Sequence, residues 1–199
     1  MPDTPKLRIF MTGVGGQGTL TATQLLAKAF LSEGLPVTAG EIHGMAQRGG
    51  VVESMLLLGL SSPKIDHGEA DILLGFEAIE TVRALPYLKP GGVVLSSSEP
   101  IWPVSVSMGK AATPDLDALR AKVESCASRT LYIPAQSMGV QAGAAQSGNL
   151  ALVGALLGMN IVPLSASAME RTLKENLKPA IADINIKALR LGLDAASQT

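Results

Sequence analysis

The strongest constraint on the fold of this chain is a glycine-rich turn near its start. The apolar segment Leu7–Met11 predicts a strand, residues 13–18 (GVGGQG) predict a tight turn, and Gly18–Leu31 predicts a helix. The glycines follow the G-x-G-x-x-G spacing, which allows a tight turn, close backbone approach and close packing of helix on strand. The free N–H groups of the helix start favour an anion, so a nucleotide site is the first hypothesis.

Length, charge and composition limit the number of domains and the kinds of partner that we expect. At 199 residues we expect a single domain, residues 1–199, with a sizeable core. The formal net charge of −1 argues against a nucleic-acid partner or an anionic membrane. Charged residues make up 17% of the chain, against about 25% in typical soluble domains. We therefore expect more apolar surface than the chain can bury alone, and hence an obligate subunit or oligomer.

The chain has one cysteine, Cys126. It excludes an internal disulfide and an iron–sulfur cluster held by this chain alone, because a cluster needs about four thiolates. Its place in a helical pattern predicts a buried or partly buried side chain. The N-terminus lacks the apolar core of a signal peptide, and the longest apolar stretch, Leu150–Met159, is too short to span a bilayer. We expect a cytoplasmic protein.

Short apolar segments and amphipathic segments alternate up to residue 134, and helical patterns dominate after it. The predicted strands are Leu7–Met11, Pro36–Ala39, Val51–Leu58, Asp71–Phe76, Gly92–Ser96 and Thr130–Ile133. The predicted helices are Gly18–Leu31, Glu77–Leu88, Pro114–Ala127, Asn149–Met159, Ser165–Asn176 and Ala180–Leu193. Most strands are apolar on both faces, which is typical of parallel strands. The order predicts an α/β fold, an open, mostly parallel, Rossmann-like three-layer sandwich with additional C-terminal helices.

Cap residues predict where several helices begin. Thr113 followed by Pro114 predicts a helix capped by the threonine, with proline at the first position. Ser165 or Ser167 is predicted to begin another helix, and Asn149 has the character of a helix cap.

The segment after the second predicted strand departs from the dinucleotide-binding pattern. That pattern places an acidic residue about 20 positions beyond the glycines, and Glu41 fits it. A helix should then follow. Instead, the polar, glycine-flanked segment 42–50 (IHGMAQRGG) runs directly into a third strand at Val51. This departure argues against NAD or FAD, although a dinucleotide site stays open as the alternative.

Four polar side chains of this segment are candidate site residues: Glu41, His43, Gln47 and Arg48. They follow a strand end, where open α/β sheets place ligands. Arg48 could bind a carboxylate or phosphate, His43 could exchange a proton, and Glu41 could orient either one. The structural alternative is an internal Glu41–Arg48 ion pair with His43 as a buried spacer. We favour an interface beside an active site, with direct catalysis by Glu41, His43 or Arg48 as the second possibility.

The glycine turn and Glu77 complete the set of candidates. Gly13, Gly15, Gly16, Gln17 and Gly18 could bind a phosphate, a carboxylate or the backbone of a partner. Alternatively, water or Gln17 satisfies the amides of a purely structural turn. Glu77 follows a predicted strand where a helix begins, so it is either a helix-start carboxylate or part of the same interface. The sequence predicts no metal ligands.

Three segments together carry a family resemblance: GVGGQG at 13–18, EIHGMAQRGG at 41–50 and ADILLGFE at 70–77. They resemble the gamma-type domain of the 2-oxoacid:ferredoxin oxidoreductases, and HGMAQRGG is similar to the form found in indolepyruvate-type members. The resemblance covers most of the chain. It implies oxidative decarboxylation of a 2-oxoacid with thiamine diphosphate, transfer of electrons to ferredoxin through iron–sulfur clusters, and formation of an acyl-CoA.

The resemblance also implies that this chain binds no cofactor. Thiamine diphosphate, Mg and the iron–sulfur clusters are expected on a larger alpha subunit, with which this chain would form a hetero-oligomer and so complete the active site. Ferredoxin would be only an indirect partner, and a homodimer is the alternative for the isolated chain. Rival functions are the gamma subunit of a pyruvate, 2-oxoisovalerate or 2-oxoglutarate enzyme, a stand-alone NAD- or FAD-binding oxidoreductase, and a non-catalytic nucleotide-binding module.

Overall fold

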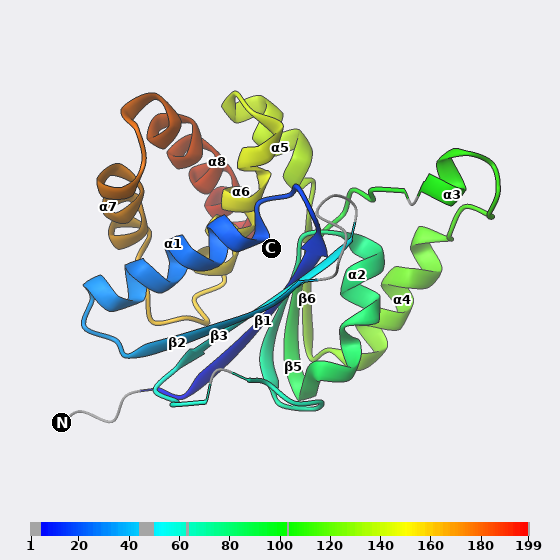
Figure 1. The fold of residues 1–199 in the computed structure, drawn as a ribbon, viewed down its shortest axis with the longest axis horizontal. Helices are drawn as coiled ribbons and strands as arrows, with labels where there is room; N and C mark the ends of the chain where they lie inside the picture. Colours follow the sequence, from blue (N-terminus) through cyan, green and yellow to red (C-terminus); the bar gives the residue numbers. More distant parts are fainter. Residues whose placement is uncertain (1–4, 44–49, 63, 103, 199) are drawn as a thin grey trace.

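The computed structural model describes residues 5–43, 50–62, 64–102 and 104–198. Six strands form one sheet in the order β2-β3-β1-β4-β5-β6 (Figure 1). Their bounds are β1 Leu7–Val14, β2 Val37–His43, β3 Val51–Leu58, β4 Ala70–Gly75, β5 Leu88–Ser97 and β6 Arg129–Ile133. The pairs β1–β4, β4–β5 and β5–β6 are parallel, whereas β3 is antiparallel to both β1 and β2. The sheet is therefore mostly parallel, as predicted.

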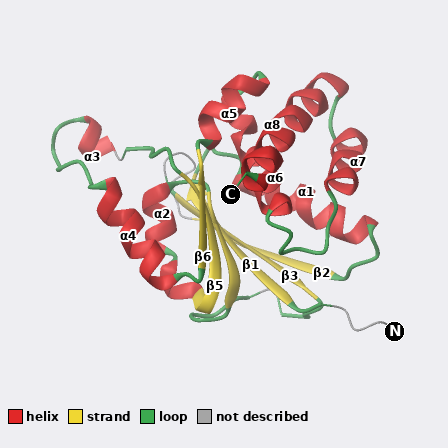
Figure 2. Cartoon of the chain, turned by 180° about the vertical axis from the view of Figure 1, so that it is seen from behind, coloured by secondary structure: helices red, strands yellow, loops and turns green. Residues whose placement is uncertain are grey.

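Helices cover both faces of this sheet. Helices α1, α5, α6, α7 and α8 lie on one face, and α2 and α4 lie on the other (Figure 2). The bounds are α1 Thr19–Ser32, α2 Ala78–Arg83, α3 Val104–Ser107, α4 Leu116–Cys126, α5 Ala135–Ala142, α6 Gly148–Gly158, α7 Ala166–Asn176 and α8 Pro179–Ser197. Two 3-10 turns, η1 Leu85–Tyr87 and η2 Ala145–Ser147, connect them. This arrangement confirms the predicted three-layer α/β fold with additional C-terminal helices.

Each face of the sheet has its own core. Along β1, Ile9 and Met11 belong to the larger core beneath α1 and α5–α8, while Phe10 belongs to the smaller core beneath α2 and α4. Successive side chains of a strand point to opposite faces of the sheet, and helices cover both faces. All three side chains are therefore fully buried. Helix α6 lies in the middle of the larger core, and residues 148–157 are all buried. The strand that is apolar on both faces therefore lies inside the sheet, with helices on either side.

Several predicted helix boundaries were wrong, among them the end of the last helix, which is Ser197 and not Leu193. The predicted helix Glu77–Leu88 ends at Arg83, since Pro86 cannot donate a backbone hydrogen bond, and a 3-10 turn leads into β5. Helix α4 is capped by Asp115 and not by Thr113: the Asp115 carboxylate accepts hydrogen bonds from the backbone N–H groups of Asp117 and Ala118. An aspartate cap two residues later leaves Pro114 outside the helix.

Cys126 was also predicted incorrectly. It is exposed, since it lies in the last turn of α4, an amphipathic helix whose one fully buried residue is Val123. Helix α5 and the 3-10 turn η2 were not predicted, because both are short and rich in Ala, Gln and Gly.

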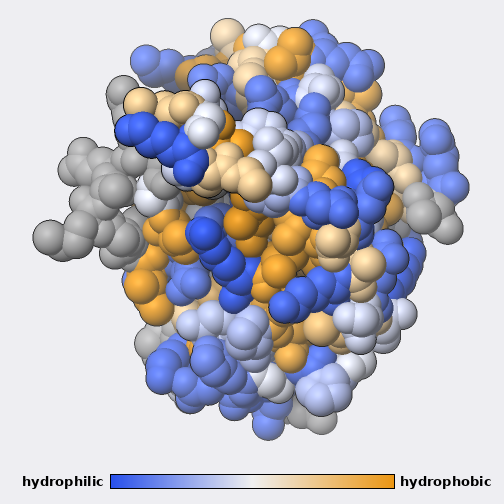
Figure 3. Space-filling view, turned by 90° about the vertical axis from the view of Figure 1, so that its right-hand side faces the viewer, coloured by the Kyte–Doolittle hydropathy of each residue, from blue (hydrophilic) through white to orange (hydrophobic). Residues whose placement is uncertain are grey.

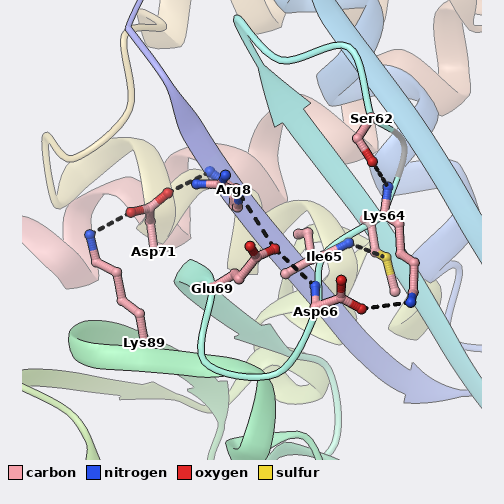
Figure 4. A network of polar contacts seen from close by, with 9 residues as sticks. Arg8, Ser62, Lys64, Ile65, Asp66, Glu69, Asp71 and Lys89 are labelled. Carbon is pink, nitrogen blue, oxygen red and sulfur yellow. Dashed lines mark hydrogen bonds and ion pairs between the residues drawn. The ribbon is translucent and has the colours of Figure 1, made fainter.

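A hydrogen bond and two ion pairs join the chain segments at the edge of the sheet where β1 and β4 begin. The Asp71 carboxylate accepts from the Arg8 backbone N–H at 2.7 Å and pairs with Lys89 Nζ at 2.5 Å (Figure 4). Arg8 Nε lies 3.8 Å from the Glu69 carboxylate. Internal contacts thus join the amino ends of these strands, and the described candidate residues lie toward the opposite, carboxyl edge.

Candidate functional site

The glycine turn lies at the carboxyl edge of the sheet, where β1 leads into α1. Gly16 and Gly18 have φ values of 103° and 76°, in the left-handed region that favours glycine. Gly18 is the N-cap of α1. A Cβ atom at Gly13 would lie 2.8 Å from Gln17 Oε1 and 2.9 Å from Phe76 Cβ. These glycines are therefore required by the turn itself.

The Gln17 side chain satisfies polar groups on two strands. Its Oε1 accepts from the Val14 N–H at 2.9 Å, and its Nε2 donates to the Phe76 carbonyl at 2.8 Å. The Gly15 N–H donates to the Gly50 carbonyl at 2.8 Å. Some backbone N–H groups of the glycine turn therefore form hydrogen bonds within the protein and are not free for a ligand. This agrees with the alternative of a structural turn.

Helix α1 begins without a side-chain cap among the described residues. Its N-cap makes no side-chain hydrogen bond, and its first turn contains no acidic residue. Asn149, which was predicted to cap α6, has a different role: α6 begins at Gly148, and Asn149 Nδ2 donates to the Gly18 carbonyl at 3.0 Å. Asn149 Oδ1 and Thr19 Oγ1 are buried and have no hydrogen-bond partner among the described residues.

Two hollows flank the glycine turn. The first, called here the strand-end hollow, has a volume of about 200 Å³ and is lined by Gly16, Gln17, Phe76, Ser97, Glu99, Ile101, Ala135, Gln136, Ala145, Gln146, Gly148, Asn149 and Leu152. The second, called the helix groove, has a volume of about 370 Å³ and is lined by Gly16, Gly18, Thr21, Leu25, Ala144, Gln146, Ser147, Asn149, Leu177, Ile181, Ile184 and Asn185. Among the described residues that line the two hollows, only Glu99 is charged, and none carries a cationic side chain.

Glu77 is fully buried, and it is the N-cap of α2. Its Oε2 accepts from the N–H groups of Ile79 and Glu80 at 2.7 and 2.9 Å, and its Oε1 accepts from the Ile101 N–H at 3.1 Å. Glu77 thus has the predicted helix-start role, and it also fixes the chain segment that walls the strand-end hollow. Burial raises the pKa of the neighbouring Glu80.

Glu99 was missed by sequence reasoning. Its carboxylate accepts from the Ser137 N–H at 3.0 Å and from the Ser137 hydroxyl, and so caps the first turn of α5 from a distant segment. A signal was available, because Glu99 follows β5 at the carboxyl edge of the sheet, as Glu77 follows β4.

Strand β2 ends, and the chain resumes at Gly50, beside the glycine turn. Strands β2 and β3 form an antiparallel hairpin in which Glu41 pairs with Ser54, and β3 begins with Val51 beside Val14 of β1. Glu41 is exposed and lies on the edge strand. His43 is the last residue of β2, while Gln47 and Arg48 lie outside the described residues. Strand β2 therefore ends, and strand β3 begins, at the same edge of the sheet as the glycine turn, Glu77 and Glu99.

The described residues include no cluster of three or more His, Cys, Asp or Glu side chains that could hold a metal ion. Within the same part of the chain, no helix is long and apolar enough to cross a membrane.

Comparison with known proteins identifies the family. The family profile described as pyruvate ferredoxin/flavodoxin oxidoreductase matches residues 8–195. This chain belongs to that family. Among its relatives, the indolepyruvate oxidoreductase subunit IorB of Pyrococcus horikoshii is 39% identical over 193 residues, which are 96% of each chain. IorB of Archaeoglobus fulgidus is 35% identical over 192 residues, again 96% of each chain.

Solved structures share the fold. The gamma subunit of a keto/oxoacid ferredoxin oxidoreductase from Geobacter sulfurreducens superimposes with a TM-score of 0.71 at 22% identity, covering 97% of this chain and 99% of that one. The 2-oxoglutarate:ferredoxin oxidoreductase from Magnetococcus marinus has a TM-score of 0.73 at 18% identity, and the match covers 98% of this chain but 31% of that one. Among these solved structures, the fold thus occurs both as nearly a whole chain and as part of a longer chain.

Proposed function

We propose that this chain is the small subunit of an indolepyruvate-type 2-oxoacid:ferredoxin oxidoreductase, and that the carboxyl edge of its sheet contacts the larger, cofactor-bearing subunit. The single observation that carries the proposal is the 35–39% identity with IorB subunits over nearly the whole of both chains. The enzyme would convert an aryl pyruvate and CoA to an acyl-CoA and CO₂, with a pair of electrons passed to ferredoxin.

The donor set of this chain supports placing the cofactors on the partner. One exposed cysteine cannot hold an iron–sulfur cluster, which needs about four thiolates. Thiamine diphosphate, when bound by the larger subunit, would supply stabilisation of the carbanion formed on decarboxylation. The residues of this chain would shape and close the neighbouring surface.

The strand order argues against the rival dinucleotide site. In a dinucleotide-binding fold, the acidic residue that binds the ribose ends the strand next to β1. Here Glu41 lies on β2, and the antiparallel strand β3 separates β2 from β1. Because neighbouring strands are about 4.8 Å apart, the Glu41 backbone is roughly 10 Å from β1. Glu41 is therefore not placed as the acidic partner that a ribose needs.

Exposed apolar surface supports a subunit role. Hydrophobic side chains gather in the middle of the face that carries α3 and α4, with hydrophilic ones around them (Figure 3). Ile101 and Met108, on either side of α3, are 40% and 60% exposed. Apolar side chains left exposed in this way favour burial against another protein.

Reconstitution tests the proposed function. The chain purified alone should have no flavin or cluster absorbance and no oxidoreductase activity. Adding the larger subunit should restore CoA-dependent reduction of ferredoxin by indolepyruvate or phenylpyruvate. Stoichiometric NAD or FAD bound to the isolated chain would contradict the proposal. Faster turnover of pyruvate, 2-oxoisovalerate or 2-oxoglutarate would instead indicate the gamma subunit of a related enzyme.

The polar segment after β2 has its own test. Arg48→Ala should impair assembly or turnover of the complex and leave this subunit folded. Arg171→Ala is the matched control, because Arg171 lies on α7 and pairs with Glu33 at 2.5 Å, away from the carboxyl edge. Equal affinity and kinetics for both variants would rule out an interface role for Arg48.

A further inference from the structure

The strand-end hollow lies where the chain leaves two neighbouring parallel strands toward opposite faces of the sheet. Strands β1 and β4 pair in parallel, and α1 follows β1 on one face while α2 follows β4 on the other (Figure 2). Gln17, after β1, and Phe76, after β4, both line the hollow. Open α/β sheets bind their ligands in the crevice at such a point. The position of the hollow therefore indicates a binding site.

The size of the hollow suits a single side chain. Its volume is about 200 Å³, whereas sites for whole small molecules enclose roughly 300–1,000 Å³. Part of the wall is apolar and includes Ala135, Leu152 and Ile101, which is 40% exposed. An apolar wall of this kind accommodates the aliphatic stem of a long side chain that carries its charge at the end.

Glu99 supplies the only charge on this wall among the described residues. The Ser137 N–H donates to one oxygen of its carboxylate at 3.0 Å, and the Ser137 hydroxyl donates to the other, so the group is held in place. A carboxylate offers about four acceptor positions, so others remain for a ligand. Glu99 is partly exposed, and the ion pairs of the described residues do not include it.

A contact between this edge of the sheet and the larger subunit would bury the Glu99 carboxylate. Burial of an unpaired charge is costly, so a carboxylate in an interface needs a cation opposite it. The carboxamide side chains of Gln136 and Gln146 line the same hollow and offer further acceptors. Arginine presents a planar fork of N–H donors and is enriched in protein interfaces. The charge and the acceptors of the hollow therefore match a guanidinium group.

We propose that the strand-end hollow receives an arginine side chain of the larger subunit, with its guanidinium group on the Glu99 carboxylate and its aliphatic stem against the apolar wall. The Gln136 and Gln146 carbonyl oxygens accept from guanidinium N–H groups that Glu99 leaves free. A phosphate or a carboxylate in the same place would be repelled by the charge of Glu99.

The inference rests on the proposed function, because it takes the arginine to come from the larger subunit of the same enzyme. It adds a defined contact at the ends of β1, β4 and β5, which does not depend on Arg48. The preference of the hollow for a cation can also be tested without the partner.

The first test uses small probes on the isolated, isotope-labelled chain. Titration with N-butylguanidinium should give saturable NMR shifts at Ser97, Glu99 and Gln136. N-butylurea, a neutral molecule of similar shape, should bind about tenfold more weakly, because it cannot pair with the carboxylate. In Glu99→Gln, which keeps an acceptor for Ser137 and removes the charge, this difference between the two probes should disappear.

Three outcomes of the titration would overturn the assignment. They are equal affinity of wild type for N-butylguanidinium and N-butylurea, tighter binding of n-butyl phosphate at the same residues, and absence of saturable shifts there. The second of these would indicate an anion site.

The second test uses the complex. Glu99→Gln should weaken binding of the larger subunit by about tenfold, and the affinity that remains should depend less on ionic strength than that of wild type. Glu175→Gln is the matched control, because Glu175 is exposed on α7, lines neither hollow, and should bind normally. A loss of affinity in Glu99→Gln with an unchanged dependence on salt would indicate a structural role of Glu99 and refute the ion pair.

Failure of the inference and failure of the proposed function are distinguishable. An active complex with equal affinity for Glu99→Gln and Glu175→Gln would refute the arginine contact and leave the proposed function intact. Failure of the wild-type chain to form any active complex would refute the proposed function and, with it, the larger subunit as the source of the arginine.

Discussion

The side-chain amide of Gln17 joins the ends of two neighbouring strands. Its Nε2 donates to the Phe76 carbonyl, 59 residues away, while its Oε1 accepts from the Val14 N–H of β1. One neutral amide therefore satisfies a backbone acceptor and a backbone donor at once. A carboxylate of the same shape cannot do both, because it has no proton to donate at neutral pH.

Gln17→Glu should therefore destabilise the fold by about 1–2 kcal/mol, since it directs a carboxylate oxygen at the Phe76 carbonyl. Urea unfolding of the isolated chain measures the change. Gln146→Glu is the control, because Gln146 is exposed and lines both hollows without such a contact. Equal stability of the two variants would show that the Gln17–Phe76 hydrogen bond contributes nothing measurable.

Gly18→Ala should cost more than Gly34→Ala, although both glycines have nearly the same φ, 76° and 75°. Each alanine carries the strain of the left-handed region, about 1 kcal/mol. At Gly34 the new Cβ meets nothing within 4 Å, whereas at Gly18 it lies 2.5 Å from Asn149 Nδ2. We expect a loss of about 2–3 kcal/mol for Gly18→Ala and about 1 kcal/mol for Gly34→Ala.

A double variant isolates the cause of this difference. In an Asn149→Ala background, the cost of Gly18→Ala in urea unfolding should fall to that of Gly34→Ala, because the side chain that the Cβ displaces is absent. If Gly18→Ala lowers the free energy of unfolding equally in the Asn149→Ala background and in wild type, backbone strain alone explains the effect.

Most strands of this fold were predictable from local pattern. Segments such as Leu7–Met11 are apolar on both faces and end at glycine, proline or serine, so their burial is visible in the sequence. Strand order is a different matter. The pairing of Val51 with Val14, which inserts an antiparallel strand between β2 and β1, depends on contacts between distant segments.

The candidate site was predictable only in part, for the same reason. The glycine turn and the interrupted pattern after Glu41 are local features, and the structure describes the turn at the expected edge. The role of Asn149 is not local. Next to Gly148 it resembles a helix cap, but its amide binds Gly18, 131 residues away. Only the packing of α6 against the start of α1 reveals that contact.

Glu77→Gln should destabilise the fold by about 1–2 kcal/mol. The Glu77 carboxylate accepts three backbone hydrogen bonds through both oxygens, and the amide of glutamine would turn an NH₂ group toward at least one of these donors. Asp115→Asn is the control, because a single oxygen of Asp115 accepts both of its hydrogen bonds at the exposed cap of α4. That change should cost only a few tenths of a kcal/mol. If Glu77→Gln and Asp115→Asn lose similar stability in thermal or urea unfolding, the second Glu77 oxygen does not have the role assigned to it.

The carboxylates of Glu80 and Glu170 should contribute to the free energy of unfolding with opposite dependence on pH. Burial raises the pKa of Glu80 in the folded state, and the nearby Arg83 only partly offsets this. The folded protein then binds this proton more tightly than the unfolded chain, whose glutamate pKa is about 4.3. The stability contributed by protonated Glu80 is complete below that value and is lost as the pH rises through the folded-state pKa. Glu80→Gln, which stays neutral, should therefore gain stability relative to wild type as the pH rises above about 4.

Glu170 should behave in the opposite way. The hydrogen bond from Arg190, at 2.7 Å, lowers the pKa of Glu170, so its contribution is present above about pH 4.3 and is lost as the pH falls through the folded-state value. Glu170→Gln should thus be less stable than wild type near neutral pH and should approach it in acid. Urea unfolding between about pH 3 and 7 measures both differences. If the Glu80→Gln profile runs parallel to wild type, Glu80 titrates equally in the folded and unfolded states, and its burial does not disfavour the charged form.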